Sequence, residues 1–312
     1  MIGYALRRFA GLGAVWFIAV VLTFVAVQFV PGDPIMAMLS DRSGDPVLEA
    51  RLRADYGLDR PLPVQFAAYL GHIIDGSFGM SFRYVNTPVR EVIATGLAIT
   101  PVLALVSAGL AIGIGVFLGV FAAVRRNSWA DTAVILVLVT GISVPNFALS
   151  AFLVYLFSIR LGVLPVAGWG SLSQMVLPVA ILVIPPTAYI ARLTRTYMLE
   201  VLGQDYIRTA RAKGLRERLV IWRHALRNTL VPLLTTVGII FGGLLSGTFV
   251  VETIFNIPGL GRLAIESIFA RDYPVTMTIV LLFTVFYSLI NLAVDLAYAA
   301  LDPRIRLGGA AA

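Results

Sequence analysis

Few residues of this 312-residue chain have side chains that could carry out covalent chemistry. It contains no cysteine, and its two histidines, His72 and His224, both fall outside the long apolar runs. A serine–histidine nucleophile or a metal site needs several such groups close together. We therefore predict that this chain has no catalytic residue, no bound metal and no cofactor of its own.

Residues that could supply energy for transport are equally few. Asp295 is the only acid that we expect inside an apolar run, one helical turn after Asn291. Such a carboxylate can couple transport to an ion gradient, but a packing or interfacial role is the simpler interpretation. An ATP-binding phosphate loop is excluded, because Lys213, the only lysine, lies between alanine and glycine rather than in a Gly-Lys-Ser/Thr motif.

The elements that position these residues are apolar helices. Hydrophobic residues make up 59% of the chain and charged residues 13%, and the mean hydropathy is +0.89. These values are typical of an all-α membrane protein. Six runs are long enough to cross a bilayer as helices. Their approximate bounds are Phe9–Val30, Leu97–Val124, Thr132–Phe157, Gln174–Ala191, Leu230–Val251 and Val275–Ala300.

Helix breakers interrupt two of these spans. Pro145-Asn146 lies within the third, and Pro178, Pro185 and Pro186 are expected to kink the fourth. Breaks of this kind are tolerated where other helices or water satisfy the freed backbone groups. The prolines are equally consistent with a span that lines a pathway and with a structural membrane helix.

Two polar segments separate the spans on one side of the membrane. The first runs from Pro31 to about Thr95, with short helices predicted over Pro46–Tyr56 and Pro63–Ile74. The second covers Glu252–Pro274 and includes a short amphipathic helix over Arg262–Ala270. We divide the chain into an N-terminal span with its polar segment (1–95), a transmembrane domain (96–301) and a C-terminal tail (302–312).

The basic residues are distributed unevenly over the loops. Fifteen of the 24 Lys and Arg residues lie on the side of the two termini, and nine lie on the other side with 11 acids. By the positive-inside rule both termini are cytoplasmic, and the 31–95 segment is periplasmic. The net charge of +7 therefore reflects membrane topology, and we expect no nucleic-acid partner.

The basic stretch Arg192–Pro232 joins the fourth and fifth spans and contains nine of the Lys and Arg residues. Asp205 is suited to cap the start of a short helix, and Gly214 is suited to a left-handed stop at its end. The sequence thus predicts two short helices around a glycine turn, projecting into the cytoplasm. Since no energy source is visible in the chain, a loop of this kind suggests a partner that supplies it.

Several motifs resemble the permease subunits of ABC importers. Arg208-Thr-Ala-Arg-Ala-Lys-Gly214, with Arg223-His-Ala-Leu-Arg-Asn228 after it, is similar to the cytoplasmic "EAA" loop of the dipeptide, oligopeptide and nickel branch. Pro31-Gly-Asp-Pro34, Val251–Gly261 and Ala299–Arg306 also match, so the resemblance covers essentially the whole chain. The chain departs from the general pattern at Arg208, Thr209 and Arg227, where a glutamate, an alanine and a proline are usual.

The resemblance implies a type I ABC importer permease fold in a bacterial or archaeal inner membrane. It implies a second permease subunit, two ATPases that bind ATP and magnesium, and a periplasmic or lipoprotein substrate-binding protein. The binding protein would be received by residues 31–95 and 252–274. The ATPase-coupling residues, within the loop 192–228, would be Asp205, Arg208, Thr209, Ala210, Arg211, Lys213, Gly214 and Leu215.

The substrate and its path are less well defined by the sequence. Candidate pathway residues are Thr140, Ser143, Asn146, Ser150 and Tyr189, small or polar side chains that would accept peptides, nickel chelates or short sugars alike. Two alternatives of another class stay open: a self-contained channel or secondary transporter that uses Asp295, and a membrane scaffold. In the second, Arg216, Arg218 and Arg223 would bind anionic lipid.

Overall fold

The computed structural model of the protein describes residues 2–39, 46–84 and 86–301. Within these ranges the chain is almost entirely helical, and an isolated β-bridge joins Met80 to Pro88. The predicted all-α class is therefore confirmed. The predicted C-terminal tail, residues 302–312, lies outside the described residues.

Within these described residues, five helices are long and apolar enough to cross a membrane, and a bent pair supplies a sixth candidate span. The five are α1 (Ile2–Gln28), α5 (Val89–Val124), α8 (Leu172–Leu202), α11 (Leu226–Ile254) and α13 (Tyr273–Leu301). They correspond to the first, second, fourth, fifth and sixth predicted spans. Despite Pro178, Pro185 and Pro186, α8 is one continuous helix.

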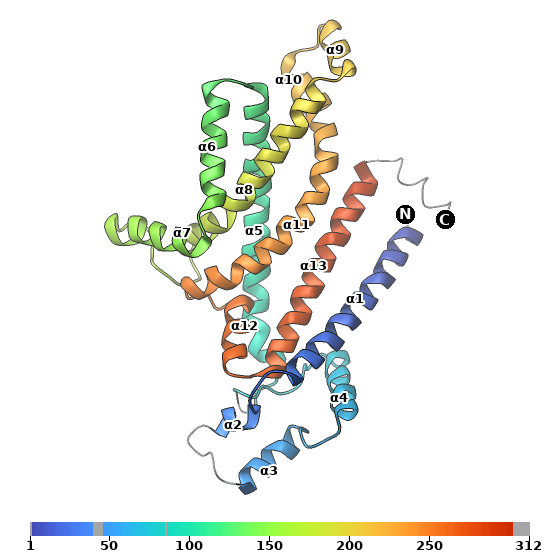
Figure 1. Ribbon diagram of the computed structural model, residues 1–312, viewed down its shortest axis with the longest axis vertical. Coiled ribbons are helices and arrows are strands. Elements are labelled where there is room, and N and C mark those ends of the chain that lie inside the picture. The colour runs from blue at the N-terminus through green and yellow to red at the C-terminus, as the bar shows by residue number, and fades with distance from the viewer. Residues whose placement is uncertain (1, 40–45, 85, 302–312) are drawn as a thin grey trace. The chain divides into compact units, whose positions relative to one another are not determined.

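The third predicted span is sharply bent. It consists of α6 (Trp129–Ser143), α7 (Asn146–Leu153) and the π-helical η2 (Val154–Arg160), and the direction changes by 105° between α6 and α7 (Figure 1). Val144 is extended, as a residue before proline prefers, and Pro145 cannot donate a helical hydrogen bond. The predicted interruption at Pro145-Asn146 is thus a turn rather than a kink.

The shorter helices lie in the polar segments. They are α2 (Pro34–Leu39), α3 (Pro46–Asp55), α4 (Leu62–Ile74), α9 (Asp205–Ala212), α10 (Glu217–Leu219), η3 (Val220–Ala225) and α12 (Leu260–Phe269). The predictions for α3, α4 and α12 are confirmed. The sequence analysis missed α2, although proline suits a first helical turn and the Asp33 carboxylate accepts a hydrogen bond from the Ile35 amide at 2.9 Å.

The chain divides into two compact units. Unit 1 comprises Met1–Ala5, Val102–Ile257 and Leu289–Ala312, and unit 2 comprises Leu6–Pro101 and Pro258–Ser288. Unit 1 contains the basic stretch and the bent span. Unit 2 contains the first polar segment, with α2, α3 and α4, and residues 258–274 of the second, with α12.

Close helix packing in unit 1 depends on glycine. A Cβ atom at Gly119 of α5 would lie 2.5 Å from the Ala191 carbonyl oxygen of α8, and one at Gly115 would lie 2.8 Å from the Ile190 Cβ. These two positions therefore allow α5 and α8 to approach closely, as small residues four apart do in membrane helices. By contrast, Gly113 has no such neighbour within 4 Å.

Unit 2 has an aromatic core of its own. The Phe24 ring of α1 lies 5.1 Å from Phe66 and 6.2 Å from Tyr69, both on α4. Met277 and Leu281 of α13 belong to the same buried cluster. Aromatic pairs at these centroid distances contribute more than their buried area alone, so α4 is held firmly on α1 and α13.

Candidate functional site

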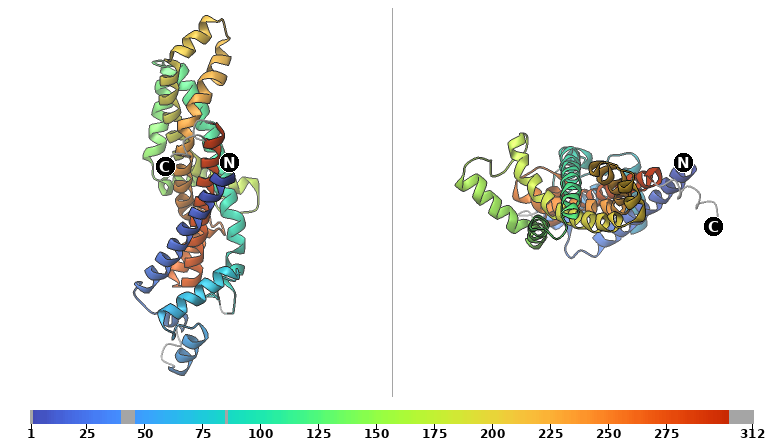
Figure 2. Two further views of the ribbon diagram at one scale, coloured as in Figure 1. Left: turned by 90° about the vertical axis from the view of Figure 1, so that its right-hand side faces the viewer. Right: turned by 90° about the horizontal axis from the view of Figure 1, so that it is seen from above.

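The basic stretch of unit 1 forms a hairpin of two short helices, α9 and α10, beyond the ends of α8 and α11 (Figure 1). A turned view places the hairpin at the same tip (Figure 2). The helix–turn–helix predicted for this segment is confirmed. One detail is different: α10 is only three residues long and continues through η3 into α11.

An apolar cluster fixes the hairpin to the helices below it. Ile207 and Ala210 of α9 are buried and pack in one cluster that joins four elements. The other buried members are Val120 and Ala123 of α5, Met198 of α8, and Val220, Ile221 and Ala225 of η3. Any force applied to α9 is therefore transmitted directly to α5, α8 and the start of α11, because packed interiors deform little.

The turn after α9 has the conformation that its sequence predicts. Gly214 has φ +77°, the left-handed region that favours glycine, and Lys213 is the C-terminal cap. The prediction for the other end is wrong: Gln204 occupies the N-cap position and makes no side-chain capping bond, while Asp205 is the first helical residue. A negative charge in the first turn still stabilises the helix dipole.

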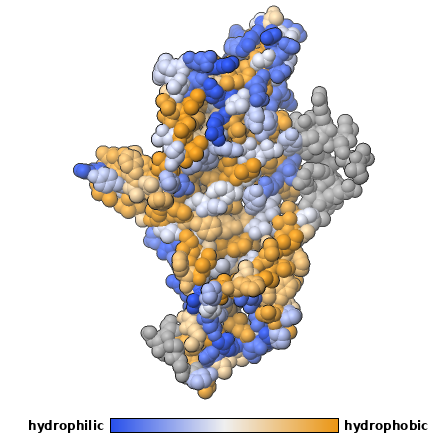
Figure 3. All heavy atoms as spheres, viewed as in Figure 1, coloured by the Kyte–Doolittle hydropathy of each residue, from blue (hydrophilic) through white to orange (hydrophobic). Residues whose placement is uncertain are grey.

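The outward face of α9 is polar and solvent-exposed. Asp205, Arg208, Thr209, Arg211 and Lys213 are all exposed, and hydrophilic residues dominate this tip in the surface view (Figure 3). The Arg211 guanidinium donates to the Glu217 carboxylate at 2.7 Å, which raises the pKa of Arg211. Of the predicted coupling residues, Ala210 faces the buried cluster and Leu215 packs against it, so these two anchor the hairpin rather than belong to its outer surface.

Two of the five predicted pathway residues come together at a pocket in unit 1. Asn146, at the start of α7, and Tyr189 of α8 line a cavity of about 320 Å³. The remaining lining residues are uncharged and come from α8 and α11: Leu182, Pro185, Pro186, Ile239, Ile240, Gly243, Leu244 and Gly247. Gly243 leaves open space on the helix, since a Cβ atom there would meet nothing within 4 Å.

The other three predicted pathway residues do not line this pocket. Thr140 and Ser143 are exposed on α6 and donate to backbone carbonyls one turn earlier, at 2.9 and 2.8 Å. Ser150 is fully buried and donates in the same way to the Asn146 carbonyl at 2.7 Å. Their hydroxyl groups therefore satisfy the helix backbone.

The sequence analysis missed a buried ion pair between α6 and α8. Asp131 is only 3% exposed, and both of its carboxylate oxygens accept hydrogen bonds of 2.7 Å from Arg195. The expectation that Asp295 is the only acid within a span is thus wrong, since α6 begins earlier than predicted and Glu252 of α11 is buried as well. Ser128 was a sequence signal for the earlier start of α6, because serine is a favoured N-cap residue. Its hydroxyl oxygen accepts a hydrogen bond from the Asp131 backbone amide.

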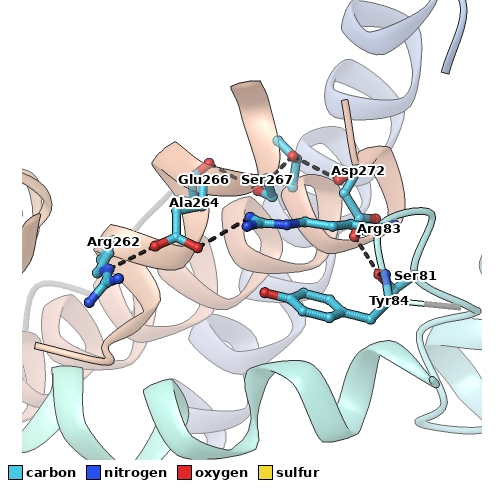
Figure 4. Close-up of polar contacts among 9 residues, drawn as sticks. Ser81, Arg83, Tyr84, Arg262, Ala264, Glu266, Ser267 and Asp272 are labelled. Carbon is cyan, nitrogen blue, oxygen red and sulfur yellow. Dashed lines mark hydrogen bonds and ion pairs between the residues drawn. The ribbon is translucent and has the colours of Figure 1, made fainter. Parts of the chain in front are cut away.

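Unit 2 contains a second polar cluster, which ties the loop after α4 to α12 and to the start of α13 (Figure 4). The buried Asp272 carboxylate accepts hydrogen bonds from the Ser81 hydroxyl and from the Phe82 and Arg83 amides. Glu266 accepts from Arg83 at 3.2 Å and from Arg262 at 2.7 Å. This network orders the two segments that were predicted to receive a binding protein.

The chain is similar to known transport proteins over its whole length. It is 42% identical over 307 residues to the dipeptide transport system permease protein of Bacillus subtilis (strain 168), covering 98% of this chain and 99% of that protein. It is 44% identical over 306 residues to the glutathione transport system permease protein of Salmonella typhimurium (strain LT2), with the same coverage. Both relatives are permease subunits by name.

Solved structures agree on the fold. The chain matches a structure described as an inward-facing conformation of the MetNI methionine ABC transporter with a TM-score of 0.59 and 20% identity. The match covers 68% of this chain and 96% of that one. The type I importer permease fold implied by the sequence motifs is therefore confirmed.

The family of the chain follows from matches to both of its parts. Residues 1–101 match the N-terminal part of the membrane component of binding-protein-dependent transport systems. Residues 115–307 match the main component, more than half of the chain. The predicted role as a transport subunit rather than an enzyme is confirmed, and so is the predicted place in the peptide branch of ABC importer permeases. The chain belongs to the family of inner-membrane components of binding-protein-dependent transport systems.

Proposed function

We propose that this subunit imports short peptides, together with a second permease, and that partner ATPases drive the transport. The observation that carries this proposal is the α9 hairpin, which is anchored by Ile207 and Ala210 and presents a polar outer face. Its outer residues Arg208, Thr209 and Lys213 are available to a partner. The hairpin lies between α8 and α11, so a displaced α9 moves both helices.

The coupling step follows from this anchoring. When the ATPases bind ATP and magnesium and close, the docked α9 moves with them. The movement passes through the cluster around Met198 and Val220 to α8 and η3, which are packed against it. The pocket that Asn146 and Tyr189 line lies between α7, α8 and α11, and we expect its shape to change as these helices tilt.

The pocket supports a passage that holds its substrate only weakly. All of its lining residues are uncharged, and Asn146 and Tyr189 offer an amide and a phenol to a peptide backbone. A site of this kind holds a peptide of any side-chain charge only weakly. Substrate choice then rests with a binding protein, which the polar segments of unit 2 would receive. We propose that residues 1–95 supply the first span and a periplasmic segment, and that residues 96–301 form the transmembrane domain with the coupling loop.

Reconstitution with the partner subunits tests this function. We expect proteoliposomes to take up a labelled dipeptide only when ATP, both ATPases and the binding protein are present. Glutathione in place of the dipeptide tests the substrate class. Gradient-driven flux through this chain alone, lost on Asp295→Asn, would instead establish a self-contained transporter and overturn the proposal.

A further inference from the structure

An open groove lies at the Gly214 turn, which follows α9. It has a volume of about 710 Å³ and is formed by α10, η3 and the first turn of α11. Its floor is apolar, made of Leu215, Leu219 and Trp222, and four arginines surround it: Arg216, Arg218, Arg223 and Arg227. We call this feature the arginine groove.

The four arginines have no acidic partner in the part of the chain that the structure describes. Nearby, Asp205 pairs with Arg208 at 3.4 Å and Glu217 with Arg211 at 2.7 Å, so two acids of this region are already engaged. All four groove arginines are exposed. The groove therefore combines concentrated positive charge with an apolar floor, on which Leu219 is 38% and Trp222 is 45% exposed.

The position of the groove identifies the chemistry of its occupant. It is built on the charge-rich residues 217–227, at the start of the helical segment Glu217–Ile254, and these residues directly precede the predicted fifth span, Leu230–Val251. Tryptophan is enriched at membrane–water interfaces, and arginine extends its charged end toward lipid headgroups from such positions. The π-helical turn of η3 buries Val220 and Ile221 on one face and leaves Trp222 and Arg223 on the other.

We propose that the arginine groove binds the headgroup of an anionic phospholipid of the surrounding bilayer, with its phosphodiester between the guanidinium groups. The acyl chains would lie along Leu219 and Trp222. A phospholipid has the same division into charged and apolar parts as the groove. Arginine suits phosphate oxygens because its planar donors can bind two of them at once. The four arginines are not among the proposed ATPase-contacting residues Arg208, Thr209 and Lys213, and the test below measures lipid binding, so its failure would leave the proposed peptide import standing.

Lipid binding to the purified full-length chain in mild detergent tests this proposal by native mass spectrometry. The probes are phosphatidylglycerol and phosphatidylcholine with identical acyl chains. We expect at least about tenfold preference for phosphatidylglycerol, lost in the triple variant Arg218→Gln, Arg223→Gln, Arg227→Gln. Each single substitution should lower this preference about twofold, which keeps the test available if the triple variant does not fold.

A matched control removes the same charge elsewhere. The triple variant Arg51→Gln, Arg60→Gln, Arg90→Gln changes three exposed arginines of unit 2 and should keep the full preference. Equal loss in both triple variants would mean that net charge alone attracts lipid, which overturns the site. Competition by glycerol 3-phosphate as strong as by lipid would identify a free phosphate ligand instead. If the triple variant of the groove lost ATPase copurification but kept its lipid binding, the groove would be a protein interface instead.

Discussion

Asp131 of α6 and Arg195 of α8 form a two-pronged ion pair, with both N–O distances at 2.7 Å. The backbone amide of Asn127 donates a third hydrogen bond to the same carboxylate at 3.0 Å. Arg195 lies one turn before Met198, which belongs to the cluster that anchors α9. The pair therefore fixes α6 to the end of α8 that carries the α9 hairpin.

Substituting Asp131 with Asn should destabilise the subunit by about 3 kcal/mol, because it leaves the Arg195 charge without its partner in a largely buried site. Thermal melting of the purified protein measures the effect. The matched control is Asp205→Asn, which removes an acid from an exposed pair and should leave the melting temperature unchanged. Equal melting temperatures for the two variants would contradict a structural role for the buried pair.

The glycine contacts between α5 and α8 give a second prediction. Gly119→Ala should destabilise the protein by about 1 to 3 kcal/mol, because the new methyl group would lie 2.5 Å from the Ala191 carbonyl oxygen. Gly113→Ala on the same helix meets nothing within 4 Å and should be neutral or stabilising by up to about 1 kcal/mol. Thermal melting distinguishes the two, and a loss in both variants would show that the close approach is not the cause.

The Gly214 turn gives a third prediction, which tests the backbone conformation of residue 214 separately from the size of its side chain. A side chain at Gly214 would meet nothing within 4 Å, so only its φ of +77° resists substitution. Gly214→Val should impair ATP-dependent uptake strongly, because a left-handed β-branched residue costs about 2 kcal/mol and reorients the hairpin. Gly214→Asn, which tolerates this region, should retain most uptake. If both variants transport equally well, the angle of the turn does not matter for coupling.

Sequence reasoning succeeded where a single local feature decides the structure. The apolar spans, the short helices α3, α4 and α12, and the left-handed Gly214 each follow from the composition or conformation of a few neighbouring residues. It failed where distant residues meet. Asp131 and Arg195 are 64 positions apart, so no local pattern pairs them.

The same limit applies to the candidate site. Ala210 belongs to the motif that resembles the family's coupling loop, but whether it faces a partner or the bundle depends on how α9 packs. Thr140, Ser143 and Ser150 were chosen by type, and their hydroxyl groups bond to their own helices. The proline at position 145 predicts a break in the third span, but not the 105° angle that brings Asn146 to the pocket.

A fourth prediction concerns the pocket lined by Asn146 and Tyr189. Gly243→Leu adds a side chain toward open space, so the fold should tolerate it while the cavity of about 320 Å³ becomes smaller. We expect initial uptake rates to fall more for a tripeptide than for a dipeptide. Gly109→Leu, at another open position on α5, is the control and should leave the ratio unchanged. A parallel fall for both peptides would place the passage elsewhere.

Site-specific cross-linking tests whether the outer face of α9 binds the partner ATPase. The chain has no cysteine, so each introduced cysteine is unique. Binding through this face predicts that Arg208→Cys and Thr209→Cys, which are exposed, cross-link to the ATPase in the assembled transporter, whereas Ala210→Cys, which is buried, does not. No cross-link from either exposed position, or an equally strong one from Ala210→Cys, would contradict it.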